Sequence, residues 1–365
     1  TQHYKGKLEG LEKVFSEDGK LEEERVYKND LIDGEEIYYY DNGKIAQKNQ
    51  YIAGKKDGKS IIYHENGNIS MEINYRNDKK DGEYIAYYDN GKKKQEGYLK
   101  NGELDGITKI YYESGKIRQI AHNKNDKKDG TIVRYYENGN PEHEWNYKND
   151  ILEGVDLEYY ESGKVKVRMF YKDGKAQGEI LSFYENGRIK EKAYYKDDML
   201  EGKFTTYFKD SKIEEEYNYK DGKLEGEYRI YYENGNLQEV GNYKDNKLEG
   251  KSLTYYESGK LDGEFNYIQD ELNGSYKNYY ENGNLKRSGV YKNGEIEGEA
   301  FFYLEDGKMG EKAFFIDGKV EGDYLFYDKT GKIIKKETYK NGNLLSTEEF
   351  EKVEEDKNES EGIKN

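Results

Sequence analysis

The chain has 365 residues, of which 37% are charged and only 33% are hydrophobic, and its formal net charge is −16. This acidity disfavours nucleic acid and anionic membrane surfaces as partners, and the absence of cysteine excludes disulfides, thiol nucleophiles and cysteine-based metal centres. The 41 tyrosines argue against a disordered chain, and they indicate a fold whose apolar surface is supplied mainly by tyrosine.

Two glycine ladders with a period of 24 residues run through the chain. The first ladder recurs from Gly10 to Gly322, and the second recurs nine residues later from Gly19 to Gly331, with Ser211 as its one exception. A clean copy, residues 219–237, reads YKDGKLEGEYRIYYENGNL. Two ladders that stay in phase over more than three hundred residues indicate a tandem repeat.

Each copy carries the signals of a β-hairpin. Paired aromatic residues precede Asn-Gly, Ser-Gly or Asp-Gly, which tolerate the positive φ of a tight turn. An aliphatic residue such as Leu237 follows the turn, and Tyr243 comes six residues later, so both share one face of a strand. Because an isolated hairpin is unstable in water, successive copies must pair with each other. The sequence therefore predicts an all-β fold, an elongated single-layer stack of about fourteen 24-residue hairpins that forms a twisted ribbon or rod.

The pattern YKDGKLEGExxxYYENGxL resembles the MORN repeat in its bacterial type-2 variant, and the resemblance covers residues 1–346. It implies a stack of β-hairpins that serves as an interaction scaffold. Some bacterial relatives are antitoxin-like, so the resemblance also implies a partner-neutralising role as an alternative.

Two neighbouring aromatic columns precede each turn glycine. The column four residues before it is aromatic in all copies, as expected for a packed, inward position. The next column points to the opposite face and is more variable, so we expect it to be the more exposed. Its tyrosines are candidates for contacts with a partner, because tyrosine offers rigid contact area and a hydroxyl; alternatively, the rings pack on each other and on lysine stems to stiffen the sheet. These candidates are Tyr40, Tyr88, Tyr112, Tyr136, Tyr160, Tyr184, Tyr232, Tyr256 and Tyr280.

Carboxylates recur at the turns, including an acid before most glycines of the first ladder. They lack the ligand spacing and bidentate glutamate of a calcium loop, and an active site needs one asymmetric constellation rather than the same residues in every copy. We therefore expect no metal site, no cofactor, no catalytic residue and no enzyme activity.

The pattern is irregular at residues 91–147, where Lys93 and Pro141 replace the aliphatic residue and the only tryptophan, Trp145, occurs. Neutral drift explains this stretch, and so does a local bend, because proline cannot donate to a strand ladder. We predict a repeat array at residues 1–346 and an acidic, disordered tail at residues 347–365.

These features favour a non-enzymatic repeat scaffold that binds another protein through a tyrosine face. Cell-wall or carbohydrate binding remains an alternative, although a single tryptophan provides few aromatic cages for sugar or choline. Phospholipid binding conflicts with the net charge. The composition suggests a bacterial protein, and a start at Thr1 in mid-pattern favours a secreted or cell-surface location, or a cytoplasmic one if no signal peptide precedes it.

Overall fold

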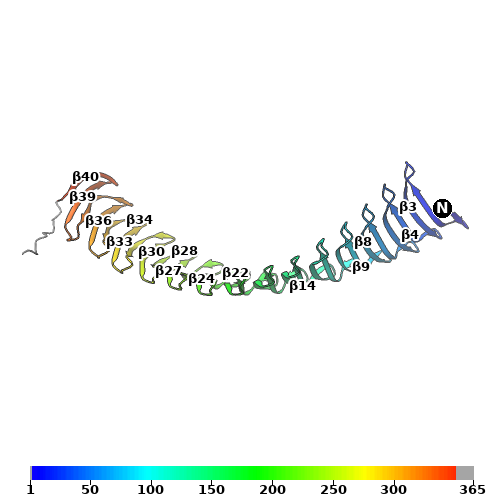
Figure 1. Ribbon diagram of the computed structural model, residues 1–365, viewed down its shortest axis with the longest axis horizontal. Helices are drawn as coiled ribbons and strands as arrows, with labels where there is room; N and C mark the ends of the chain where they lie inside the picture. Colours follow the sequence, from blue (N-terminus) through cyan, green and yellow to red (C-terminus); the bar gives the residue numbers. More distant parts are fainter. Residues whose placement is uncertain (1, 351–365) are drawn as a thin grey trace, which may run out of the picture. The chain divides into compact units, whose positions relative to one another are not determined.

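The computed structural model describes residues 2–350. The chain divides into two units, residues 1–187 (unit 1) and residues 188–365 (unit 2). Within the described residues both units consist of β-strands joined by turns, and no helix is long and apolar enough to cross a membrane. The all-β hairpin stack predicted from the sequence is thus confirmed for each unit (Figure 1).

In unit 1 every repeat contributes two strands, and the first of them is often interrupted at the residue before the ladder glycine. After the short β1 (Gln2–Tyr4), the first strands are β2 (Lys7–Phe15), β4 (Leu31–Tyr39), β6 (Lys55–Lys56) with β7 (Gly58–Tyr63), β9 (Lys79–Tyr87), β11 (Glu103–Leu104) with β12 (Gly106–Tyr111), β14 (Lys127–Tyr135), β16 (Ile151–Leu152) with β17 (Gly154–Tyr159), and β19 (Lys175–Ala176) with β20 (Gly178–Phe183). The second strands are β3 (Leu21–Lys28), β5 (Ile45–Ile52), β8 (Ile69–Arg76), β10 (Lys93–Lys100), β13 (Ile117–Lys124), β15 (Pro141–Lys148) and β18 (Val165–Lys172).

Unit 2 repeats the same arrangement. Its second strands are β21 (Ile189–Lys196), β24 (Ile213–Lys220), β27 (Leu237–Lys244), β30 (Leu261–Ile268), β33 (Leu285–Lys292), β36 (Met309–Ile316) and β39 (Ile333–Lys340). Its first strands are β22 (Met199–Leu200) with β23 (Gly202–Tyr207), β25 (Lys223–Leu224) with β26 (Gly226–Tyr231), β28 (Lys247–Leu248) with β29 (Gly250–Tyr255), β31 (Glu271–Leu272) with β32 (Gly274–Tyr279), β34 (Glu295–Ile296) with β35 (Gly298–Tyr303), β37 (Lys319–Val320) with β38 (Gly322–Tyr327), and finally β40 (Asn343–Glu349).

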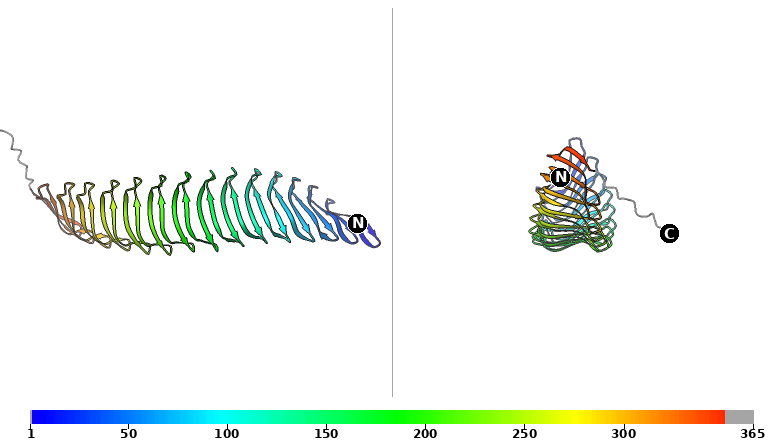
Figure 2. Two further views of the ribbon diagram at one scale, coloured as in Figure 1. Left: turned by 90° about the horizontal axis from the view of Figure 1, so that it is seen from below. Right: turned by 90° about the vertical axis from the view of Figure 1, so that its left-hand side faces the viewer.

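Strand pairing is antiparallel and follows the order of the chain within each unit. In a typical repeat Tyr228 of β26 lies opposite Gly241 of β27, and β27 pairs in turn with β29, where Glu239 lies opposite Thr254. The strands are bowed, and the turns lie along the two long edges of each unit (Figure 2). Each unit is therefore an open, single-layer sheet whose contacts are local in sequence.

The turn chemistry agrees with the prediction. In the repeat of β26 and β27, the backbone N–H of Tyr232 donates to the carbonyl of Asn236 at 2.9 Å, and Gly235 has a φ of 92°. At the other edge, Asp245 and Asn246 both have positive φ, 49° and 69°, as a type I′ hairpin turn requires.

Most buried residues lie in one row that runs along each unit, and we call it the core row. It joins the residue two positions after each glycine of the first ladder to the residue opposite it on the next strand. Examples are the pairs Ser60/Ile73, Tyr84/Gly97, Thr108/Ala121, Tyr228/Gly241, Ser252/Phe265, Tyr276/Gly289 and Ala300/Ala313. In some repeats a large side chain lies opposite a small one, as Tyr228 lies opposite Gly241, whereas in others both members are small, as in Ala300/Ala313.

Two expectations need correction, and the irregular stretch at residues 91–147 proves regular in its strand pairing. The column four residues before the turn glycine is not the core: it is half-buried, and Phe15 is 55% exposed, because this column faces the side opposite the core row. Residues 91–147 pair with the same register shift as other repeats, and Pro141 fits because it is the first residue of β15. The array continues to Glu349 rather than ending at residue 346, since β40 pairs with β39; residues 351–365 of the expected tail lie outside the described residues.

Candidate functional site

The tyrosines that the sequence proposed as partner contacts also join neighbouring repeats. In eight of them the hydroxyl donates a hydrogen bond to the backbone carbonyl 23 residues later, for example Tyr160 to Phe183 at 2.7 Å and Tyr256 to Tyr279 at 2.6 Å. The eight donors are Tyr40, Tyr88, Tyr112, Tyr136, Tyr160, Tyr232, Tyr256 and Tyr280. We call these residues the tyrosine clamp.

The clamp residues are half-buried, like most residues of the neighbouring aromatic column, so the structure does not set this column apart as the more exposed one. Their ring faces are partly covered by cations, such as Lys94 at 5.8 Å from the ring centre of Tyr88 and Lys286 at 5.4 Å from that of Tyr280. The clamp hydroxyls are therefore engaged within the array, and only the ring faces are left to meet a partner. Tyr184, the ninth candidate, is also half-buried and engaged in interactions.

In most copies the acid before the glycine of the first ladder caps a turn in the following repeat. Glu225 accepts a hydrogen bond from the backbone N–H of Asp245 at 3.0 Å, and Glu249 accepts one from Gln269 at 3.1 Å. Equivalent bonds recur in both units. Within residues 2–350 no group of three or more histidines and acids is arranged to hold a metal ion. The repeated acids thus have a local structural role in the turns.

Trp145 lies in the core row of unit 1 within a polar cluster. Its ring stacks on His143 at 4.0 Å, and the guanidinium of Arg134 lies 5.2 Å from it. The Nε2 atom of His143 lies 2.6 Å from a carboxylate oxygen of Asp156. Burial raises the pKa of Asp156, and the hydrogen bond from His143 opposes that rise. The tryptophan is therefore packed into the sheet and is not an isolated surface anchor.

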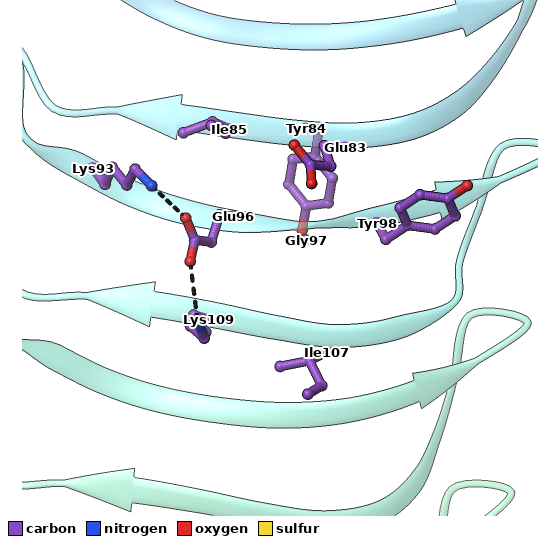
Figure 3. Close-up of a pocket in the computed structure, with 9 residues that line it drawn as sticks. All are labelled: Glu83, Tyr84, Ile85, Lys93, Glu96, Gly97, Tyr98, Ile107 and Lys109. Atoms are coloured by element: carbon purple, nitrogen blue, oxygen red, sulfur yellow. Dashed lines mark hydrogen bonds and ion pairs between the residues drawn. The ribbon is translucent and has the colours of Figure 1, made fainter.

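An open cavity of about 380 Å³ lies on the other face of unit 1, between β9 and β12 (Figure 3). Glu96 lies at its centre, with Lys93 Nζ at 2.7 Å and Lys109 Nζ at 3.4 Å from its carboxylate oxygens. Tyr98 and Ile107 line the rim and are 44% and 49% exposed. Lys93 takes the place of the aliphatic residue that follows the turn in most copies. This irregularity of the sequence therefore supplies one of the two lysines that pair with Glu96.

The cluster predicts a pH dependence of stability. The bonds from Lys93 and then from Tyr111 lower the pKa of Glu96 to about 2. A lowered carboxyl pKa contributes stability that is present above the unfolded value near 4.5 and is lost as the pH falls toward 2. We expect Glu96→Gln to destabilise the protein at pH 7 by about 1 kcal/mol or less, given the solvent screening of a half-exposed pair. Urea unfolding from pH 7 to pH 3 measures this. Equal losses for wild type and variant across that range would contradict it.

In each unit, exposed apolar residues on the face opposite the core row were not predicted from the sequence as a set. Tyr98, Phe170, Tyr194, Val290 and Phe314 are 41–49% exposed and occupy one column. In five other copies the column holds asparagine, and Asn218, for example, donates a hydrogen bond to the backbone carbonyl of Glu227 at 2.6 Å. The replacement of the recurrent asparagine by an aromatic residue in four copies of this column was the available signal.

Comparison with known families identifies the repeat. The family model described as a MORN repeat variant matches thirteen segments of 22 residues, at 8–29, 32–53, 56–77, 80–101, 104–125, 128–149, 152–173, 176–197, 200–221, 224–245, 248–269, 272–293 and 320–341. No match was found among the curated proteins.

Solved structures give only distant similarity. The crystal structure of TcdB2-TccC3-Cdc42 is similar with 11% identity and a TM-score of 0.16 over 90% of this chain. That of TcdB2-TccC3-TEV is similar with 10% identity and a TM-score of 0.17 over 92% of this chain. This chain spans 23% and 22%, respectively, of the length of those two chains.

Proposed function

The chain belongs to the MORN repeat family in its variant form, and from this premise we propose that it is a non-enzymatic repeat scaffold that binds another protein. The observation that supports the proposal is the recurrence of the same side-chain columns at fixed spacing along each unit. A repeated surface of this kind suits an extended partner that makes the same contact several times. Aromatic rings that remain half-exposed in the tyrosine clamp add contact area at low entropic cost.

Partner capture with the full chain tests this function. Wild-type protein carrying a photo-crosslinker is compared with a variant in which the exposed residues Tyr98, Phe170 and Phe314 are replaced by serine, and with one in which Tyr160 and Tyr232 are replaced by leucine. We expect reproducible capture of a defined protein by the wild type, and reduced capture by at least one variant whose circular dichroism is native.

Equal capture by all three proteins, or capture of no protein by any of them, would contradict the proposal. Recovery of a toxin would identify the antitoxin-like form of this scaffold. Binding to peptidoglycan or to anionic vesicles in parallel assays, without any protein partner, would replace the proposal with a wall-binding or membrane-binding function.

A further inference from the structure

Three consecutive repeats of unit 2 place a glutamate at the same position on the face that carries the core row. These residues are Glu191 of β21, Glu215 of β24 and Glu239 of β27, and we call them the carboxylate stripe. Thr206 lies opposite both Glu191 and Glu215, and Ile230 lies opposite Glu215. Successive carboxylates are thus two strands apart, which is about 10 Å in a β-sheet.

The stripe has no cationic partner within the described residues, although all three glutamates are half-buried. Glu239 accepts hydrogen bonds from the hydroxyls of Tyr228 and Ser252, but no lysine, arginine or histidine forms an ion pair with any of the three. Burial, and then the neighbouring Glu214, raise the pKa of Glu215. Withdrawing unpaired carboxylates from water costs free energy, so the stripe is a place where the fold leaves negative charge uncompensated.

The opposite face provides the contrast. Glu216 directly follows Glu215 and points the other way, where it pairs with Lys203 and accepts a hydrogen bond from Tyr231 at 3.3 Å. Glu264 on that face likewise pairs with Lys251 at 2.6 Å. The chain therefore supplies lysines to neutralise glutamates on one face and leaves the stripe without them.

Aromatic rings accompany the stripe. Tyr228 lies 4.9 Å from Tyr243 and 6.0 Å from Tyr217, measured between ring centres. Burial, and then the charge of Glu191, raise the pKa of Tyr195. Within residues 2–350 the hydroxyl oxygen of Thr206, between Glu191 and Glu215, is buried without a hydrogen-bond partner. The carboxylates attract a cation by Coulomb interaction, and the half-buried rings of Tyr217 and Tyr243, rather than the buried ring of Tyr228, are available for cation–π contact.

We propose that the carboxylate stripe binds an extended basic segment of a partner protein, with a lysine or arginine at every third residue. The proposal rests on the protein-binding function above and names the chemistry of the bound segment. The polyproline II conformation advances about 9.3 Å in three residues, close to the ~10 Å between successive carboxylates. The net charge of −16 favours the approach of such a segment.

Synthetic peptides test the stripe directly. The probe is a fluorescent peptide of four Lys-Pro-Pro triplets, and a peptide of the same composition with its four lysines adjacent controls for charge alone. Both are titrated with the full chain at low and at physiological salt, with fluorescence anisotropy as the readout. We expect the triplet peptide to bind at least five-fold more tightly than the clustered one, and its binding to weaken as salt is added.

Matched variants locate the binding. The triple variant Glu191→Gln, Glu215→Gln, Glu239→Gln should weaken binding of the triplet peptide by at least ten-fold, with native circular dichroism. The control variant Glu216→Gln, Glu227→Gln, Glu299→Gln removes the same charge from the opposite face and should bind like the wild type. Equal binding by the stripe variant and the wild type, equal losses in the two variants, or equal affinity for the two peptides would overturn the proposal.

The two proposals can fail separately. If a captured protein partner binds the stripe variant as tightly as the wild type, the stripe is not the binding surface but the scaffold function stands. If the wild type captures no protein, the scaffold function fails regardless of the behaviour of the peptides.

Discussion

Replacing Gly241 with isoleucine is expected to destabilise unit 2 by about 3 kcal/mol, the upper part of the range for overpacked cores. A Cβ atom at Gly241 would lie 2.8 Å from Cε1 of Tyr228. The tyrosine is 3% exposed and lies against Tyr217 and Tyr243, so its ring cannot move away freely. Denaturant unfolding, combined with hydrogen exchange of the amides of β26 and β27, measures the loss in the repeat concerned.

The chain itself supplies the rescue. In another repeat the equivalent pair is Ser60 opposite Ile73, with the large residue on the other strand. The double variant Tyr228→Ser, Gly241→Ile should therefore recover most of the stability that each single substitution loses, because volume across the pair is restored. Additive losses in the double variant would contradict the pairing of large with small residues in the core row.

Removing three hydroxyls of the tyrosine clamp together should lower the free energy of unfolding by about 3 kcal/mol, at about 1 kcal/mol for each hydrogen bond. The variant is Tyr232→Phe, Tyr256→Phe, Tyr280→Phe, whose hydroxyls donate at 2.8, 2.6 and 2.8 Å to carbonyls of the following repeats. The rings remain, so the loss reports the hydrogen bonds between repeats. Urea unfolding followed by circular dichroism measures it.

The column four residues before the turn glycine gives the control. No hydrogen bond from the hydroxyls of Tyr255, Tyr303 or Tyr327 to another described residue is present, so their replacement by phenylalanine should change stability by less than about 0.5 kcal/mol. Similar losses in the two triple variants would show that the clamp bonds do not join the repeats.

The local rules of the repeat were readable from the sequence. Positive φ at turn residues, alternation along strands and the marginal stability of an isolated hairpin together lead to a stack, and the structure agrees in each unit. Turn chemistry depends on neighbouring residues alone, so it can be read without knowledge of the packing.

Which of the side-chain columns are buried could not be predicted from the sequence in the same way. The constant aromatic column was expected to be the core, yet the core row is the variable one, in which Tyr276 faces Gly289 and Ala300 faces Ala313. The constant aromatic column lies on the opposite face, whereas the buried pairs of the core row differ in size and polarity from copy to copy. A search for a tyrosine followed thirteen residues later by a glycine would have found three pairs of this row, Tyr84/Gly97, Tyr228/Gly241 and Tyr276/Gly289.

The central claim, that this MORN-repeat chain binds a protein through columns that repeat along its sheet, is tested most directly by hydrogen exchange of the full chain with and without the captured partner. We expect new protection at equivalent positions in at least three consecutive repeats of one unit, spaced 24 residues apart. Protection confined to a single repeat, or none in residues 2–350 despite saturating partner, would contradict the account.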